Sequence, residues 1–155
     1  MLDHDWIAQH IPHQGGMCLL DSVVGWDSQR IQCRAGSHRS LDNPLRWRGQ
    51  LGAACGIEYA AQAMAVHGAL LAPADSSRPR AGFLVSVRGA RLHVPRLDDI
   101  SADLDIDALC ISSSGDNILY QFSLHAGGRL LLDGRAAVVV NADSITPALP
   151  TGDTP

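Results

Sequence analysis

The feature that most constrains this fold is a long alanine-rich segment, LGAACGIEYAAQAMAVHGALLAPA, at positions 51–74. It has almost no β-branched residues, so its propensity favours a helix that runs to about Leu71. Such a segment is long enough to cross a bilayer, but Glu58, Gln62 and His67 interrupt it. A carboxylate at a bilayer centre costs about 2.5–3.5 kcal/mol on insertion scales. Because the helix is apolar nearly all round, we expect it to be enclosed within a globular domain.

Strand-like segments lie on both sides of this helix in the sequence. A short amphipathic helix is predicted at 3–11, and the strand patterns span 18–26, 30–35, 82–94, 100–111, 117–126 and 129–140. In the second of these patterns Ile31, Cys33 and Ala35 alternate with polar residues, which is typical of a half-buried strand. The order of elements predicts an α+β domain, with an antiparallel sheet of about six strands wrapped around one long central helix.

The length of 155 residues fits one domain, which we place at 1–142, followed by a loose tail at 143–155. A linker loop is expected at 72–80, between the helix and the later strands. One sheet covers an apolar helix on all sides only if it curls strongly. A second protomer would complete the cover, so we expect a homodimer.

The amino-acid composition excludes several classes of function. The net charge is −4, and the twelve basic residues are all arginines scattered along the chain, whereas a nucleic-acid footprint is usually more basic. None of the four cysteines forms a CxxC pair, and the chain has no HExxH motif, so neither a metal site nor a disulfide framework is expected. The N-terminus lacks the pattern of a signal peptide, and we therefore predict a cytoplasmic protein.

Glu58 is the only glutamate in the chain, and it lies in the most apolar segment. An ionised carboxylate in such a place is costly unless it is paired or opens to a cavity. We therefore expect its pKa to be raised, which suits a general acid or base. The alternative is a side chain that only reaches solvent or an arginine. Gln62, four residues further on, faces the same way.

Two loop histidines are candidate partners for Glu58. His38 is the first choice because it lies in the loop before the helix, and His13 follows Pro12 in a glycine-rich loop. His67 is nine residues from Glu58 and therefore about half a turn away around the helix, so it is not expected to share the site.

Three motifs resemble the hot-dog-fold 3-hydroxyacyl-[acyl-carrier-protein] dehydratases, and most closely the branch associated with aryl-polyene or xanthomonadin pigment synthesis. IPHQGGMCLLDSVVGWD is similar to the family's opening, GIEYAAQAMAVHG to its central helix, and GFLVSVRGARLHVPRLDD to the strand that follows. The resemblance covers roughly residues 9–141. The family's Gly-His-Phe-Pro and Met-Pro-Gly loop is absent here, where the chain reads GSHRSLDNPLRWRGQLGAACGIE.

This resemblance implies dehydration of 3-hydroxyacyl thioesters to trans-2-enoyl thioesters, with the substrate held on the phosphopantetheine of an acyl carrier protein and no further cofactor. It implies a dimer, either of identical chains or with a homologous hot-dog subunit, in which a histidine of one protomer and a carboxylate of the other flank the substrate. Glu58 matches the carboxylate. Gln62 matches the residue one turn on, and the resemblance implies that Gln62 and Gly56 bind the substrate. Backbone N–H groups near a helix start, here at Gly56, would polarise the thioester carbonyl.

In this family histidine removes the proton at C2, and the carboxyl group helps the 3-hydroxyl leave. His38 or His13 fills the histidine role. The missing loop leaves two alternatives open, which are an acyl thioesterase that uses Glu58 to activate water and a catalytically weak acyl-binding subunit.

Overall fold

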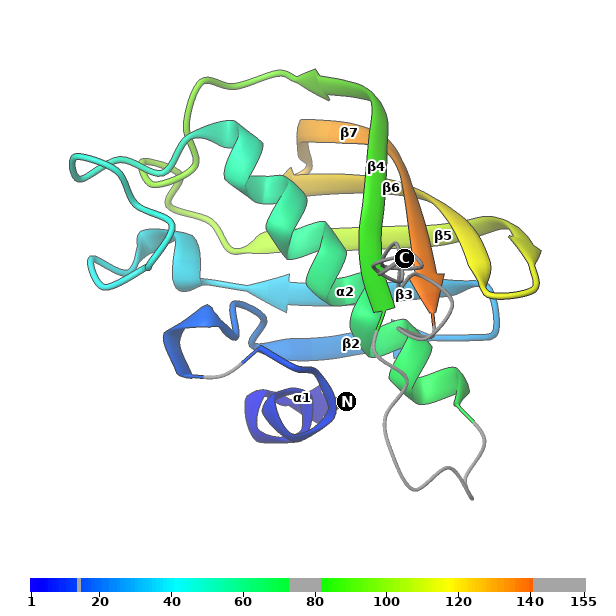
Figure 1. The fold of residues 1–155 in the computed structure, drawn as a ribbon. Helices are drawn as coiled ribbons and strands as arrows, with labels where there is room; N and C mark the ends of the chain where they lie inside the picture. The colour runs from blue at the N-terminus through cyan, green and yellow to red at the C-terminus, as the bar shows by residue number, and fades with distance from the viewer. Residues whose placement is uncertain (14, 73–81, 141–155) are drawn as a thin grey trace, which may run out of the picture.

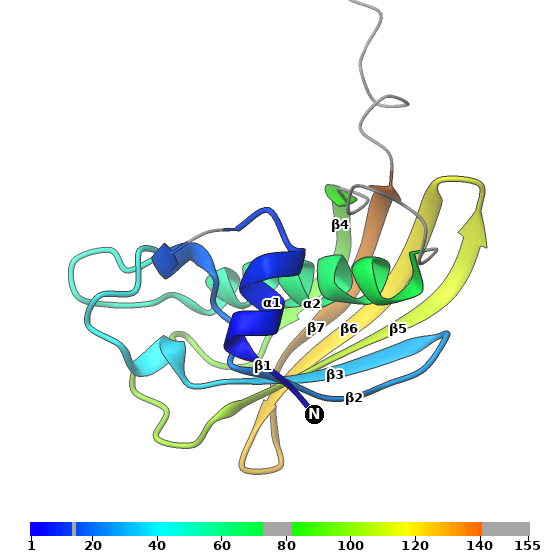
Figure 2. The same ribbon diagram turned by 90° about the horizontal axis from the view of Figure 1, so that it is seen from below.

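A computed structural model describes residues 1–13, 15–72 and 82–140 of the chain. It contains one antiparallel sheet of seven strands in the order β1-β2-β3-β5-β6-β7-β4. The strands are β1 (Leu2–Asp3), β2 (Ser22–Trp26), β3 (Arg30–Ala35), β4 (Gly82–Leu92), β5 (Leu104–Ser114), β6 (Asn117–Ala126) and β7 (Arg129–Val140). Figure 1 shows the sheet behind a single long helix, and Figure 2 shows it curving beneath that helix.

The central helix is α2 (Gly56–Leu71), which one turn of 3-10 helix, η3 (Ala53–Cys55), precedes. Tyr59, Ala60, Ala63 and Val66 are fully buried on the face that packs against the sheet. The opposing sheet face carries the alternating apolar residues of β3 and β5, among them Ile31, Cys33, Leu104 and Ile106. The predicted wrapping of a sheet around one helix is therefore confirmed.

The N-terminal helix α1 (His4–His10) lies beside α2 at one end of the sheet (Figure 2). The carboxylate of Asp3 accepts a hydrogen bond from the Trp6 amide at 2.9 Å and so caps the helix start. The helix ends before Pro12, whose ring disfavours helical backbone in the preceding residue. Two further 3-10 turns, η1 (Gly15–Met17) and η2 (Ser37–Arg39), lie in the loops that flank β2 and β3.

Most predicted elements appear close to their expected positions, with four differences. The strand expected at 18–26 begins at Ser22. The sheet has a seventh strand, because the two residues of β1 pair with β2. The α-helix begins at Gly56, since residues 53–55 form the 3-10 turn. The strand expected at 100–111 begins at Leu104 and ends at Ser114. The expected tail at 143–155 and most of the 72–80 linker lie outside the described residues.

Part of the molecular surface is apolar and open. Strand β4 forms one edge of the sheet, and Leu84, Val85 and Leu92 on it are 40%, 56% and 49% exposed. Beside that edge, the face of α2 that carries Ala61 and Ala65 is only partly covered. Among residues 1–13, 15–72 and 82–140, the enclosure expected for this helix is thus incomplete. No helix among the described residues is long and apolar enough to span a membrane.

Candidate active site

A cavity of about 240 Å³ lies between α2, the loop after α1 and the strands β4 and β7. It is lined by Pro12, His13, Glu58, Ala61, Ala65, Leu84 and Val138. Glu58, Ala61 and Ala65 lie on one face of α2, because residues three and seven apart along a helix point the same way. The small alanine side chains leave room beside the carboxylate. The cavity therefore combines one acid and one imidazole with apolar walls.

Glu58 and His13 contact each other directly within one chain. The His13 Nε2 atom lies 3.1 Å from Oε1 of Glu58, and the two side chains are 25% and 34% exposed. The other ring nitrogen, Nδ1 of His13, is buried and has no hydrogen-bond partner among the described residues. The imidazole is therefore oriented with Nε2 toward the carboxylate, and the two groups can exchange a proton. The family resemblance implied a pair split between protomers, but here one protomer supplies both groups.

The pKa of Glu58 is lowered, which is the opposite of the sequence prediction. The main cause is the hydrogen bond from His13, and partial burial acts in the other direction without overcoming it. A smaller lowering comes from a hydrogen bond with Gln62. The prediction considered burial alone. It missed the histidine that stabilises the ionised carboxylate.

Gln62 holds the loop that carries His13 against the helix. Its side chain is fully buried; Oε1 accepts a hydrogen bond from the Leu19 amide at 2.8 Å, and Nε2 donates to the Met17 carbonyl at 2.6 Å. Both ends of this amide bond to backbone groups, and the amide also bonds to Glu58. The resemblance implied that Gln62 contacts the substrate. The geometry instead assigns it to positioning the segment after His13.

Gly56 is also used differently from the expectation. Its N–H donates to carbonyls of the preceding 3-10 turn, at Ala53 and Ala54, so it is not free to face a thioester. A Cβ atom at this position would come within 2.6 Å of Leu132 Cδ2 and 3.2 Å of Leu124 Cδ2. The absence of a side chain therefore lets the start of α2 pack closely onto β6 and β7.

His38, the first-choice histidine, does not line the cavity. It is fully buried, and its Nε2 lies 2.9 Å from the Ile100 carbonyl, to which it donates. Burial lowers the pKa of His38, which favours the neutral ring. Its role in this structure is to join η2 to the loop before β5. The structure brings His13 to Glu58 and leaves His38 in the interior.

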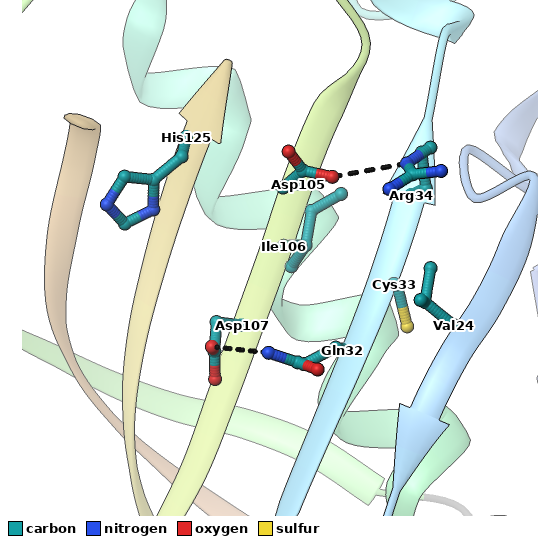
Figure 3. Close-up of a pocket in the computed structure, with 8 residues that line it drawn as sticks. All are labelled: Val24, Gln32, Cys33, Arg34, Asp105, Ile106, Asp107 and His125. Atoms are coloured by element: carbon teal, nitrogen blue, oxygen red, sulfur yellow. Dashed lines mark hydrogen bonds and ion pairs between the residues drawn. The ribbon is translucent and has the colours of Figure 1, made fainter. Parts of the chain in front are cut away.

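We find no second pairing of an acid and an imidazole at an apolar cavity among the described polar clusters. No group of three or more His, Cys, Asp or Glu side chains that could hold a metal ion occurs among the described residues. A hollow on the outer face of the sheet, drawn in Figure 3, is lined by residues of β2, β3, β5 and β6. There Arg34 is paired with Asp105, and Gln32 with Asp107, so these four polar side chains already have partners.

The family follows from the sequence model that this chain matches. Residues 6–147 match the model of the ApeP-like family, described as the ApeP dehydratase. The chain belongs to the ApeP-like dehydratase family. This ApeP-like protein is thus a dehydratase-type lyase, and the family associates it with acyl-thioester dehydration in aryl-polyene biosynthesis, as the sequence resemblance implied. No curated protein sequence matches the chain.

Solved structures show the same hot-dog fold. A chain of the dehydratase heterocomplex ApeI:P from Xenorhabdus doucetiae is 23% identical with a TM-score of 0.77, and the match covers 93% of this chain and 94% of that one. AziG from S. sahachiroi is 13% identical, with a TM-score of 0.59 and coverage of 81% and 92%. A mutant of thioesterase PA1618 from Pseudomonas aeruginosa is 13% identical, with a TM-score of 0.57 and coverage of 77% and 79%.

The sequence did not point to the cavity walls on the sheet side. Leu84 and Val138 reach the site because β4 pairs with β7 in a register that sets these two residues opposite each other. That pairing joins segments far apart in the chain, and no local pattern reports it. The Pro12-His13 pair was visible in the opening motif, but its proximity to Glu58 depends on how the loop folds back onto α2.

Proposed function

We propose that this ApeP-like protein removes water from a 3-hydroxyacyl thioester held on the phosphopantetheine arm of an acyl carrier protein, with His13 and Glu58 as its proton-transfer pair. The observation that carries the proposal is the 3.1 Å contact between His13 Nε2 and Glu58 Oε1 at an apolar cavity. Membership of a dehydratase family supports the reaction type. We also propose that the protein requires no cofactor of its own and acts in the cytoplasm.

The proposed chemistry balances within the pair and the substrate. The Nε2–H of neutral His13 donates to Glu58, so the unprotonated Nδ1 takes the proton from C2 once the substrate reaches it, and the electrons of that C–H bond form the C2=C3 double bond. The C3–O bond breaks as the imidazolium of His13 returns that proton to the departing hydroxyl, which leaves as water. Glu58 is ionised at neutral pH because its pKa is lowered, so it stabilises the imidazolium that forms between the two steps.

We further propose that a second hot-dog subunit covers the open edge of the sheet. Three observations support this pairing: the exposed apolar residues of β4, the partly open face of α2, and the neighbouring cavity. An unprotected edge strand of this kind is a template for pairing with another chain. The similar structure from Xenorhabdus doucetiae is a heterocomplex of dehydratase subunits, which favours a homologous subunit as the partner.

The test of the reaction is a mass-spectrometric assay of a 3-hydroxyacyl carrier protein incubated with the purified protein. An enoyl product supports the proposal. Release of the free acid would show a thioesterase instead, and an unchanged substrate would contradict catalysis by this chain alone and favour the acyl-binding subunit. Replacement of Glu58 by Gln keeps the size of the side chain and removes the charge. We expect Glu58→Gln to lower kcat by about 10²–10⁴-fold, the usual contribution of general acid–base catalysis, because proton transfer by His13 loses the charge that stabilises its imidazolium.

A further inference from the structure

Three arginines, Arg88, Arg91 and Arg135, gather on the outer face of the sheet near the open edge, and we call them the edge arginine patch. They line a hollow of about 480 Å³ formed by β4, β6 and β7. Arg88 and Arg135 stand directly opposite each other in the pairing of β4 with β7. Residues in this relation share one face of the sheet at close range, and like charges there are destabilising.

Arg88 and Arg135 face no acid in the strand pairing, whereas Arg91 stands opposite Asp133. None of the patch's three guanidinium groups forms an ion pair with any of the described residues. The residue opposite Arg135 on β6 is the neutral Gln121. Asp133 is the one carboxylate that lines the hollow, and it lies 3.5 Å from His93 Nε2.

Elsewhere on the same face the arginines are neutralised. On β3, Arg30 is paired with Asp107, and Arg34 Nε lies 3.2 Å from Asp105 (Figure 3 shows the second pair). The sheet therefore alternates charge where two of its own strands meet. Toward the strand whose outer edge is open, the cross-strand pair of Arg88 and Arg135 forms no ion pair with the described residues.

We infer that the edge arginine patch selects the subunit that pairs with β4, favouring a hot-dog subunit with acidic residues on its facing strand over a second copy of this chain. The inference rests on the proposed subunit pairing. Strand β4 runs from Gly82 to Leu92, so Arg88 lies next to its middle. In a twofold antiparallel pairing the middle residues of the two strands meet, and both copies of Arg88 then lie close together on one face.

A homodimer through β4 would thus bring two patches together, each already holding a like-charged cross-strand pair. An acidic strand at the same place would instead neutralise Arg88 and its neighbours. Complementary charge of this kind steers partner choice more than it adds affinity, because like-charge contacts suppress wrong partners. The apolar residues Leu84 and Val85 supply attraction toward either partner, and the patch discriminates between them.

The experiment measures self-association of the purified chain by sedimentation, without substrate. The wild type should associate weakly at low salt and more tightly as salt rises, because the Debye length falls to about 3 Å at 1 M salt and the repulsion is screened. The double variant Arg88→Ser/Arg135→Ser should associate about 10-fold more tightly at low salt, within the usual range of electrostatic effects on association. Arg129→Ser is the matched control, since Arg129 is exposed and lies at the β6–β7 turn.

A second arm supplies the acidic partner from the same backbone. Mixing wild type with Arg88→Asp/Arg135→Asp should yield mixed dimers in excess over both homodimers by native mass spectrometry, and salt should remove the excess. A statistical mixture, or tight wild-type association that neither salt nor the serine variant alters, would overturn the inference. If the association constant does not change when Arg88 and Arg135 are replaced, the subunit contact lies elsewhere on the surface. These readouts need no catalysis, so an inactive protein would contradict the proposed reaction and not the patch.

Discussion

Replacing Gln62 with Met tests whether the buried amide holds the His13 loop in place. Methionine has a similar size but offers no hydrogen bonds. The Leu19 N–H and the Met17 carbonyl, now bonded at 2.8 Å and 2.6 Å, would lose their partners. An unsatisfied buried polar group costs about 1–3 kcal/mol, and part of this is recovered by relaxation, so we expect Gln62→Met to lower the free energy of unfolding by about 2–4 kcal/mol.

Urea denaturation measures this loss, and the folded fraction is then assayed for dehydration. We expect kcat per folded molecule to fall as well, because the loop carrying His13 loses its attachment to α2 and Glu58 loses its hydrogen bond with Gln62. Gln50→Met is the matched control: Gln50 is exposed, and such surface changes are usually within about 0.5 kcal/mol. Wild-type stability together with wild-type kcat in Gln62→Met would refute the positioning role.

Two further predictions separate structural from catalytic groups. His13→Ala should lower kcat by about 10²-fold or more with little loss of stability, since His13 is at the cavity. His38→Ala should lower the thermal midpoint while the folded protein keeps its kcat, because His38 is buried and bonded to Ile100. Comparable kcat losses in the two variants would contradict the assignment of His13 to catalysis. Tyr59→Phe removes a hydroxyl that lies 2.7 Å from Ser37 Oγ, and it should cost about 0.5–1.5 kcal/mol in urea unfolding with kcat unchanged. An unchanged unfolding free energy would show that this hydrogen bond contributes nothing net.

The fold could be predicted from the sequence because its patterns are local. The alternation of Ile31, Cys33 and Ala35 has the period of a strand, and the alanine-rich run around Ala60 has the propensity of a helix. The start of α2 was less visible, because the sequence of residues 53–55 does not distinguish a 3-10 turn from the first turn of an α-helix. The two-residue β1 was missed because it gains its character only from pairing with β2.

The site was only half visible in the sequence. Glu58 was identified because a lone carboxylate in an apolar helix needs a reason. Its partner was less certain, because sequence proximity to the helix favoured His38, whereas the fold carries that residue into the interior. The predicted direction of the Glu58 pKa shift was wrong for the same reason. The shift depends on the hydrogen bond from His13 and not on burial alone.

The most direct test of the His13–Glu58 pair uses the fact that Glu58 is the only glutamate. Carbon-13 label in the glutamate side-chain carboxyl gives one NMR signal in the folded protein, and its titration reports Glu58 alone. The wild type should titrate below the usual glutamate pKa. His13→Ala removes the main cause of that lowering and leaves the opposing effect of burial, so its midpoint should move to higher pH.

The lowered pKa of Glu58 also affects the stability of the fold. A carboxyl whose pKa is lowered by folding contributes stability above its unfolded pKa, and this contribution is lost as the pH falls through the folded value. The wild type should therefore lose more stability than His13→Ala over that acidic range. If Glu58 titrates at an ordinary glutamate pKa in the wild type, and at the same pH in His13→Ala, the two groups do not form a coupled pair and the proposed site is wrong.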